Sequence, residues 1–109
     1  MNNIPSPYVI PGRQIVTPEK IINRVCEYYG ITSDKILRKG RKMTYARARQ
    51  IAIYLLRSRL KMTYPDIGGL FNQHHTTAMY SMRYVSGQLT ARVDNDFKTD
   101  IPRITRFFC

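Results

Sequence analysis

The segment that most constrains this chain is residues 63–77, with the sequence TYPDIGGLFNQHHTT. It begins with Thr63 and Asp66, whose spacing gives a capping-box-like helix start with aspartate in place of the preferred glutamate. A turn follows, and then a polar stretch that can open another helix. The segment therefore predicts a short helix at about 64–70, a tight turn, and a second helix at about 73–89, which is the arrangement of a helix-turn-helix.

Glycines and an asparagine carry the prediction of the turn. Gly68 and Gly69 each weaken a helix by roughly 1 kcal/mol relative to alanine, so we expect them where another helix backbone approaches closely. Asn72 is expected to cap the second helix. That helix has an apolar stripe at helical spacing, and Gly87 falls late in it and leaves its end open. The stripe consists of Ala78, Met82, Val85 and Leu89.

Another helix is predicted near the start of the chain. Thr17 can cap it, and Pro18 suits its first position because that residue needs no backbone N–H there. Gly30 is expected to end the helix in the C′ position. Its apolar stripe consists of Ile21, Ile22, Val25, Cys26 and Tyr29.

The longest helix is predicted at about 45–60, with Thr44 as its cap. A short turn opened by Ser33 and a basic loop at 38–43 come before it. Apolar residues recur in the helix at i, i+3, i+4 and i+7, which is the pattern of a core-facing side. These residues are Ala48, Ile51, Ala52 and Leu55.

The two ends of the chain are predicted to differ from the helical body. Residues 1–16 hold prolines at positions 5, 7 and 11, so we expect an extended arm. Asp94 or Asn95 can open a last short helix. Pro102 is badly placed to continue that helix, so the residues beyond it are expected to turn or fray.

The charge of the chain is strongly positive and unevenly placed. The formal net charge is +11, and from residue 35 to residue 65 lysines and arginines occur with no aspartate or glutamate among them. Charges that serve only solubility are normally mixed in sign, whereas a block of one sign attracts polyanions. A helix-turn-helix beside such a block predicts a protein that binds double-stranded nucleic acid.

The length and the patterning predict one domain. No internal repeat or strand-like alternation is present, and 109 residues suffice for a single core. We therefore expect an all-α fold, a small helical bundle that contains the helix-turn-helix. We expect residues 1–16 to form the arm, residues 17–104 the nucleic-acid-binding domain, and residues 105–109 a tail.

Other classes of protein are disfavoured. No apolar run is long enough to span a bilayer, and the N-terminus lacks the order of a signal peptide. Cys26 and Cys109 have no metal-ligand spacing, and a reducing cytoplasm fits both. No phosphate-binding loop of the form Gly-x-x-x-x-Gly-Lys-[Ser/Thr] occurs, so we expect no nucleotide cofactor.

The adjacent histidines His74 and His75 allow a metal-binding or a catalytic interpretation. Neighbouring helix residues point about 100° apart, however, and no carboxylate or thiolate with ligand spacing is near. We therefore expect no metal, no cofactor and no enzymatic activity, and we interpret the pair as nucleic-acid contacts. Thr76 and Thr77 are interpreted likewise, although threonine also simply suits a helix start.

Alternatives stay open for several residues outside this pair. Tyr80 and Arg83 are expected on the outer face of the second helix, where contact with phosphates and plain solvation are equally possible. Arg47 and Arg49 have a structural alternative, which is pairing with Asp66 or with a helix C-terminus. The tyrosines interpreted as packing residues rather than stacking platforms are Tyr28, Tyr29, Tyr54 and Tyr84.

Two motifs, in order and behind the basic loop, carry a family resemblance. One is residues 46–56, ARARQIAIYLL. The other is Ile67-Gly68, then Phe71-Asn72, then His75-Thr76-Thr77. The first is similar to an Ala-Arg-x-Arg-Gln helix, and the second to the signature around Asp-His-Thr-Thr, in the C-terminal DNA-binding domain of the bacterial replication initiator DnaA. The resemblance extends over about residues 15–104.

This resemblance implies a helical bundle with a helix-turn-helix related to that of the Trp repressor, and binding to double-stranded DNA. It implies that Arg41 enters the minor groove and that Arg57 contacts DNA near the major groove. It also implies that residues 75–77 face bases and phosphates. The complete predicted DNA-binding set is Arg38, Lys39, Arg41, Lys42, Arg57, Lys61, Gln73, His74, His75, Thr76, Thr77, Tyr80 and Arg83.

The chain departs from the family just before the shared histidine. The family usually has arginine and then aspartate there, whereas this chain has Gln73 and His74. A carboxylate can accept from a cytosine amino group, whereas an imidazole prefers a purine N7 or a phosphate, so we expect a site other than the family's usual box. The length also leaves no room for the initiator's ATPase module, so we expect a stand-alone relative, as would suit a phage or mobile element.

The leading interpretation is a sequence-preferring protein that binds double-stranded DNA in the cytoplasm, at the nucleoid, and acts in replication initiation or its regulation. The alternatives are a transcriptional regulator, a regulatory protein that binds replication proteins, and, on charge alone, a binder of structured RNA. A recognition helix fits the wide major groove of B-form DNA and not the narrow one of A-form RNA, which favours DNA.

Overall fold

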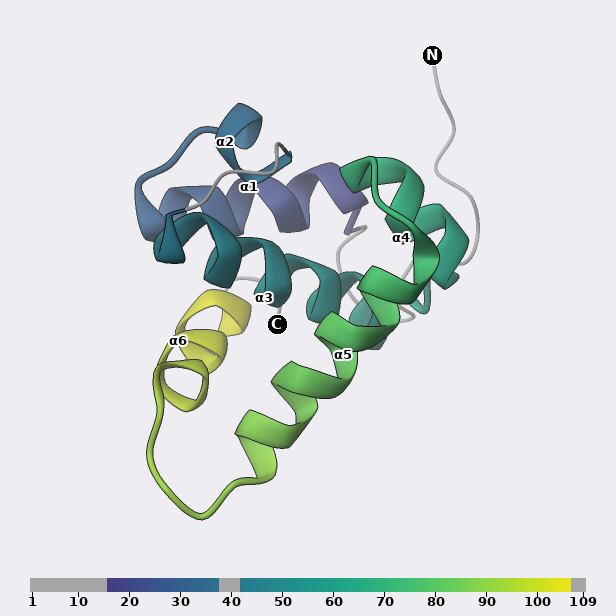
Figure 1. Cartoon of the computed structure of the whole chain (residues 1–109). Coiled ribbons are helices and arrows are strands. Elements are labelled where there is room, and N and C mark those ends of the chain that lie inside the picture. Colours follow the sequence, from purple (N-terminus) through teal and green to yellow (C-terminus); the bar gives the residue numbers. More distant parts are fainter. Residues whose placement is uncertain (1–15, 38–41, 107–109) are drawn as a thin grey trace.

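The computed structural model describes residues 16–37 and 42–106, and within these ranges every regular element is a helix (Figure 1). The helices are α1 (Pro18–Tyr29), α2 (Ser33–Leu37), α3 (Met43–Leu60), α4 (Tyr64–Phe71), α5 (His75–Thr90) and α6 (Asp96–Thr105). The prediction of an all-α fold with a helix-turn-helix is confirmed. None of these helices is long and apolar enough to cross a membrane.

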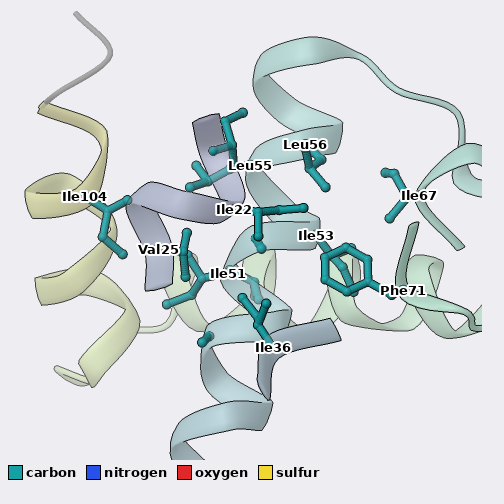
Figure 2. Close-up of a cluster of buried hydrophobic side chains, with 14 of the residues drawn as sticks. Ile22, Val25, Ile36, Ile51, Ile53, Leu55, Leu56, Ile67, Phe71 and Ile104 are labelled. Atoms are coloured by element: carbon teal, nitrogen blue, oxygen red, sulfur yellow. The ribbon is translucent and has the colours of Figure 1, made fainter. Parts of the chain in front are cut away.

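Helix α3 lies at the centre of the bundle, where it contacts α1, α2, α4 and α5. Figure 2 shows apolar side chains converging on it from several helices, among them Val25 of α1, Phe71 of α4 and Ile104 of α6. Full burial of a side chain of this size contributes roughly 1.5–3 kcal/mol before conformational entropy is subtracted. Val16, which the sequence placed in the arm, is also buried in this core.

The sequence signals of α1 are confirmed. The Thr17 side chain accepts a hydrogen bond from the backbone N–H of Lys20 at 3.1 Å, and Pro18 occupies the first helical position. Gly30 ends the helix with φ of +67°, a left-handed conformation that glycine adopts without a steric penalty. The short element at α2 is likewise where the sequence predicted a turn.

The prediction that Thr44 caps α3 is wrong. The helix begins at Met43, so Thr44 lies inside its first turn, and Lys42 takes the cap position without a side-chain hydrogen bond. The ammonium group of Lys42 instead lies 5.7 Å from the centre of the Tyr45 ring. This cation–π contact, rather than a threonine cap, accompanies the earlier beginning of the helix.

The prediction that Asn72 caps the second helix of the helix-turn-helix is also wrong. Asn72 has φ of +54° and ends α4, because asparagine tolerates the left-handed conformation better than most residues. His74 takes the cap position of α5, which therefore begins at residue 75 rather than 73. At its other end α5 passes through Gly87 and continues to Thr90.

Pro102 does not end α6, contrary to the prediction. Asn95 caps the helix by accepting from the backbone N–H of Lys98 at 3.2 Å, and the helix runs through the proline to Thr105. Ile101 and Ile104 are buried on both sides of Pro102. Their burial offsets the lost backbone hydrogen bond that a helical proline normally costs.

The two arginines of the ARARQ segment have structural partners. Arg47 pairs with Asp96 of α6 at 3.1 Å, so the predicted pairing with Asp66 is wrong for this residue. The Arg49 Nε–H donates to the backbone carbonyl of Ile36, near the C-terminal end of α2, at 2.9 Å. The prediction of pairing with a helix C-terminus is thus confirmed, and both arginines fasten α3 to its neighbours.

Candidate nucleic-acid interface

The turn between α4 and α5 depends on one of the two neighbouring glycines. The Gln73 backbone N–H donates to the Gly68 carbonyl at 2.8 Å, which folds the turn back on α4. A Cβ atom at residue 68 would lie 2.5 Å from the Gln73 carbonyl oxygen and 3.3 Å from the His75 nitrogen. A Cβ atom at Gly69 would meet nothing within 4 Å. The predicted close approach is therefore confirmed for Gly68 and not for Gly69.

The beginning of α5 presents polar side chains to solvent. His74 caps the helix through Nδ1, which accepts from the Thr76 backbone N–H at 3.2 Å. Its ring lies 4.3 Å from that of His75, with 32° between the ring planes. His75, Thr76 and Thr77 are all exposed. The structure thus brings together, at one helix start, four of the residues that the sequence predicted as DNA contacts.

Gln73 stands apart from these neighbours. Its side chain is half-buried, and its Oε1 atom is enclosed without a hydrogen-bond donor among the described residues. The carbonyl end of this amide therefore faces the protein rather than a ligand. Of the predicted contacts in the turn, Gln73 is the least ready to reach a base edge.

Tyr80 and Arg83 continue the exposed face of α5. They follow Thr76 at the spacing that places residues on one side of a helix, and both are exposed, as predicted for an outer face. Tyr80 is 66% exposed, and its ring is stacked with that of Tyr84 at 6.4 Å between ring centres. Tyr84 also meets the edge of Phe97 at 5.7 Å. The aromatic pair is thus anchored at one end and open to solvent at the other.

Arg57 has a role that the sequence did not reveal. Its Nη1–H donates to the Met62 carbonyl at 3.0 Å, and its guanidinium lies 4.7 Å from the centre of the Tyr64 ring. These contacts connect the end of α3 to the start of α4. Guanidinium has five N–H donors, and the hydrogen bond to Met62 uses one of them. A DNA contact by Arg57 would use the remaining N–H groups.

Lys42 and Lys61 lie at opposite ends of α3, and both are exposed. At 1.5 Å per residue this helix is roughly 27 Å long, which exceeds the width of one groove. Lys61 ends the helix with φ of +59° immediately before α4. The other basic-loop candidates, Arg38, Lys39 and Arg41, lie outside the described residues.

Titratable side chains elsewhere in the described part of the chain show no metal-binding arrangement. No group of three or more His, Cys, Asp or Glu residues there is arranged to hold a metal ion. Burial raises the pKa of the Cys26 thiol above its usual value, as expected for an inert cysteine in a core. The polar start of α5, where His74, His75, Thr76 and Thr77 are exposed together, is the candidate functional site.

The helical bundle, the glycine-dependent turn and the exposed start of α5 define a helix-turn-helix protein. The family model of the bacterial dnaA protein helix-turn-helix matches residues 18–85, which is more than half of the chain. The chain belongs to this family. The match includes α1 to α4 and the first two-thirds of α5, and thus the whole helix-turn-helix.

Individual relatives agree with the family match. The chain is 42% identical over 74 residues to chromosomal replication initiator protein DnaA 2 of Protochlamydia amoebophila. It is 37% identical over 76 residues to the DnaA protein of Corynebacterium jeikeium and 35% identical over 78 residues to DnaA 1 of Chlamydia pneumoniae. These matches cover 68%, 69% and 72% of this chain, but only 16%, 13% and 17% of the relatives.

Proposed function

We propose that this protein binds double-stranded DNA with sequence preference, and that it acts in replication initiation or its regulation. The first turn of α5 would lie in the major groove, as the second helix of a helix-turn-helix does. The basic loop and the cations at the ends of α3 would contact the minor groove and phosphates. The initiator names of the relatives support the assignment to replication.

One observation carries the proposal. A turn that only glycine permits at residue 68 holds His74, His75, Thr76 and Thr77 together at an exposed helix start. In a chain of net charge +11 these side chains face a partner that is expected to be polyanionic. Threonine methyl groups can meet thymine methyl groups, and imidazoles can donate to purine acceptors, so this start suits base edges as well as phosphates.

A salt titration tests the DNA binding. Contacts to four to six phosphates give a slope of log K against log salt of about −4 to −5 on B-form DNA. Fluorescence anisotropy with a labelled duplex measures it, and an RNA duplex of the same sequence tests the RNA alternative. A slope near zero, or tighter binding to the RNA duplex, would contradict the proposal.

A matched pair of lysine variants tests where the DNA lies. Lys61→Ala removes a charge just before α4 and is expected to reduce the slope by about 1 if Lys61 contacts a phosphate. Lys20→Ala makes the same change of charge on α1 and is expected to alter the slope much less. Equal effects of the two variants would indicate that only the total charge matters, and not this surface.

A second candidate function is the binding of a replication protein. The stacked and exposed pair Tyr80 and Tyr84 favours it, because aromatic side chains are enriched at protein interfaces. Tyr80→Ala tests it in a pull-down of purified replication proteins with and without nuclease treatment. Capture that needs intact DNA and does not need Tyr80 would rule it out.

A further inference from the structure

The capping hydrogen bond of His74 fixes which of its ring nitrogens carries the proton. The backbone N–H of Thr76 can only donate, so Nδ1 of His74 must accept through its lone pair. In the neutral imidazole the other nitrogen then carries the proton, so Nε2 is a donor. The Thr76 hydroxyl, 2.8 Å from the same Nδ1, reinforces this assignment when it donates.

The donor faces away from the helix that the ring caps. His74 is exposed, and Nδ1 is the ring atom turned toward the backbone of α5. The centre of the His75 ring lies 4.3 Å from that of the His74 ring, and this neighbour limits how far the His74 ring can rotate. The cap and the neighbouring ring together hold one N–H donor at the position where a helix-turn-helix meets base edges.

We propose that His74 is a specificity-determining residue whose Nε2–H donates to the N7 atom of a purine, while Nδ1 holds the cap. This inference rests on the proposed DNA binding and deepens it. Both purines present N7 as an acceptor in the major groove, and a cytosine presents an amino donor there, which would oppose the Nε2–H group. The protein therefore prefers a purine to cytosine at one position of its site.

The test combines a variant of the protein with a variant of the DNA. The preferred duplex is first selected from a random pool with the unmodified protein. Each of its purines is then replaced in turn by the 7-deaza analogue, which lacks the N7 acceptor but keeps base pairing. Fluorescence anisotropy is expected to show a loss of affinity of about five- to ten-fold at one purine that contacts His74, and the other purines serve as internal controls.

The protein variant must keep the helix cap at residue 74 and remove only the Nε2–H donor. His74→Asn does this, because asparagine is a preferred N-cap residue but its side chain is too short to place a donor where Nε2 lies. We expect this variant to have an unchanged melting temperature, to lose more affinity for the preferred duplex than for random DNA, and to show no response to the 7-deaza purine that affects the unmodified protein. His74→Ala is expected to lose the cap as well and to melt at a lower temperature.

Several outcomes would overturn the inference while leaving the proposed function intact. One is a His74→Asn protein that keeps the full response to the same 7-deaza purine. Another is an equal loss of affinity on every duplex, which would make His74 a phosphate contact. If the unmodified protein shows no base preference at all, the sequence preference in the proposed function fails as well.

Discussion

The α1–α6 contact and the start of α5 both carry polar side chains, but the start of α5 leaves part of them turned to solvent. Where α1 meets α6, the hydroxyls of Tyr28 and Tyr29 donate to the two carboxylate oxygens of Asp100, at 2.9 and 2.5 Å. At the start of α5, His75 and Thr77 are turned to solvent instead. Polar groups that satisfy each other stabilise the fold, whereas exposed ones are available to a partner.

This comparison predicts that stability and DNA binding are separable. Changes at the α1–α6 contact should alter the free energy of unfolding and leave binding intact, once the protein is folded. Changes at His75 and Thr77, on the exposed start of α5, should weaken DNA binding and leave the free energy of unfolding nearly unchanged. The turn between α4 and α5 is the exception, because it contributes both to the stability of the fold and to the position of the DNA-binding residues.

The largest effect is expected at that turn. Gly68→Ala forces a Cβ atom against the Gln73 carbonyl oxygen, which is backbone and cannot simply rotate away. We expect the free energy of unfolding to fall by about 3 kcal/mol, at the upper end of overpacking costs, and DNA binding to weaken with it. Urea unfolding followed by circular dichroism measures the stability.

The neighbouring glycine supplies the control for this turn. Gly69→Ala adds the same atom in open space within α4, so we expect a gain of up to about 1 kcal/mol from the better helix propensity of alanine. Similar losses in the two variants would show that the close approach at residue 68 is unimportant.

The next effect concerns the α1–α6 contact. Asp100→Ala leaves the hydroxyls of Tyr28 and Tyr29 without their shared acceptor in a partly buried place. We expect a loss of about 2 kcal/mol in the free energy of unfolding and an unchanged dissociation constant for DNA at a temperature where the protein is folded. A change in DNA affinity without a change in stability would break the comparison.

A smaller effect is expected for the exposed histidine of the first turn. His75→Ala should cost about 1.5 kcal/mol of binding on the preferred duplex and much less on random DNA. Its stability should stay within about 0.5 kcal/mol, because the side chain is exposed and the cap belongs to His74. Thermal unfolding and anisotropy on the two duplexes measure both quantities, and an equal loss on both would assign His75 to a phosphate.

The smallest effect is a pH dependence at the α1–α6 contact. Burial, and then the hydrogen bond to Asp100, raise the pKa of Tyr29 above its ordinary value near 10. The unfolded chain therefore releases this proton at a lower pH than the folded chain does. The contribution to stability is complete below about pH 10 and is lost as the pH rises above it.

Tyr29→Phe removes the titrating hydroxyl and isolates this effect. We expect the variant to lose less stability between pH 9 and pH 11 than the unmodified protein, since other tyrosines and lysines titrate equally in both. Urea unfolding at each pH measures the difference. Parallel curves for the two proteins would show that Tyr29 does not contribute to the alkaline loss.

The sequence predicted most of the helices because their signals are local. Thr17, Pro18 and Gly30 bound α1 as expected, and the stripes of α1 and α3 are buried except for Tyr29, which is half-buried. One error arose where a residue type fits two positions. Asn72 can cap the start of a helix or end one in the left-handed conformation, and only the close turn against Gly68 selects the second.

The sequence predicted which residues form the candidate site, but not the contacts that hold their side chains. Residues 74–77 do lie together at an exposed helix start, as their order along the chain implied. The role of Arg57 could not be read from the chain, because its contacts with Met62 and Tyr64 depend on how α3 and α4 meet. Histidine is also an uncommon cap, so no propensity rule pointed to the His74 hydrogen bond.

The sequence by itself determined the helical class, the helix-turn-helix and the excess of positive charge, because periodicity, turn residues and charge are properties of neighbouring residues. Tertiary structure alone decided which polar groups far apart in the chain pair with one another. It assigned Asp100 to Tyr28 and Tyr29, and it let α6 continue through a proline because apolar side chains are buried on both sides of it. Such choices depend on distances between residues far apart in the chain, which no local pattern contains.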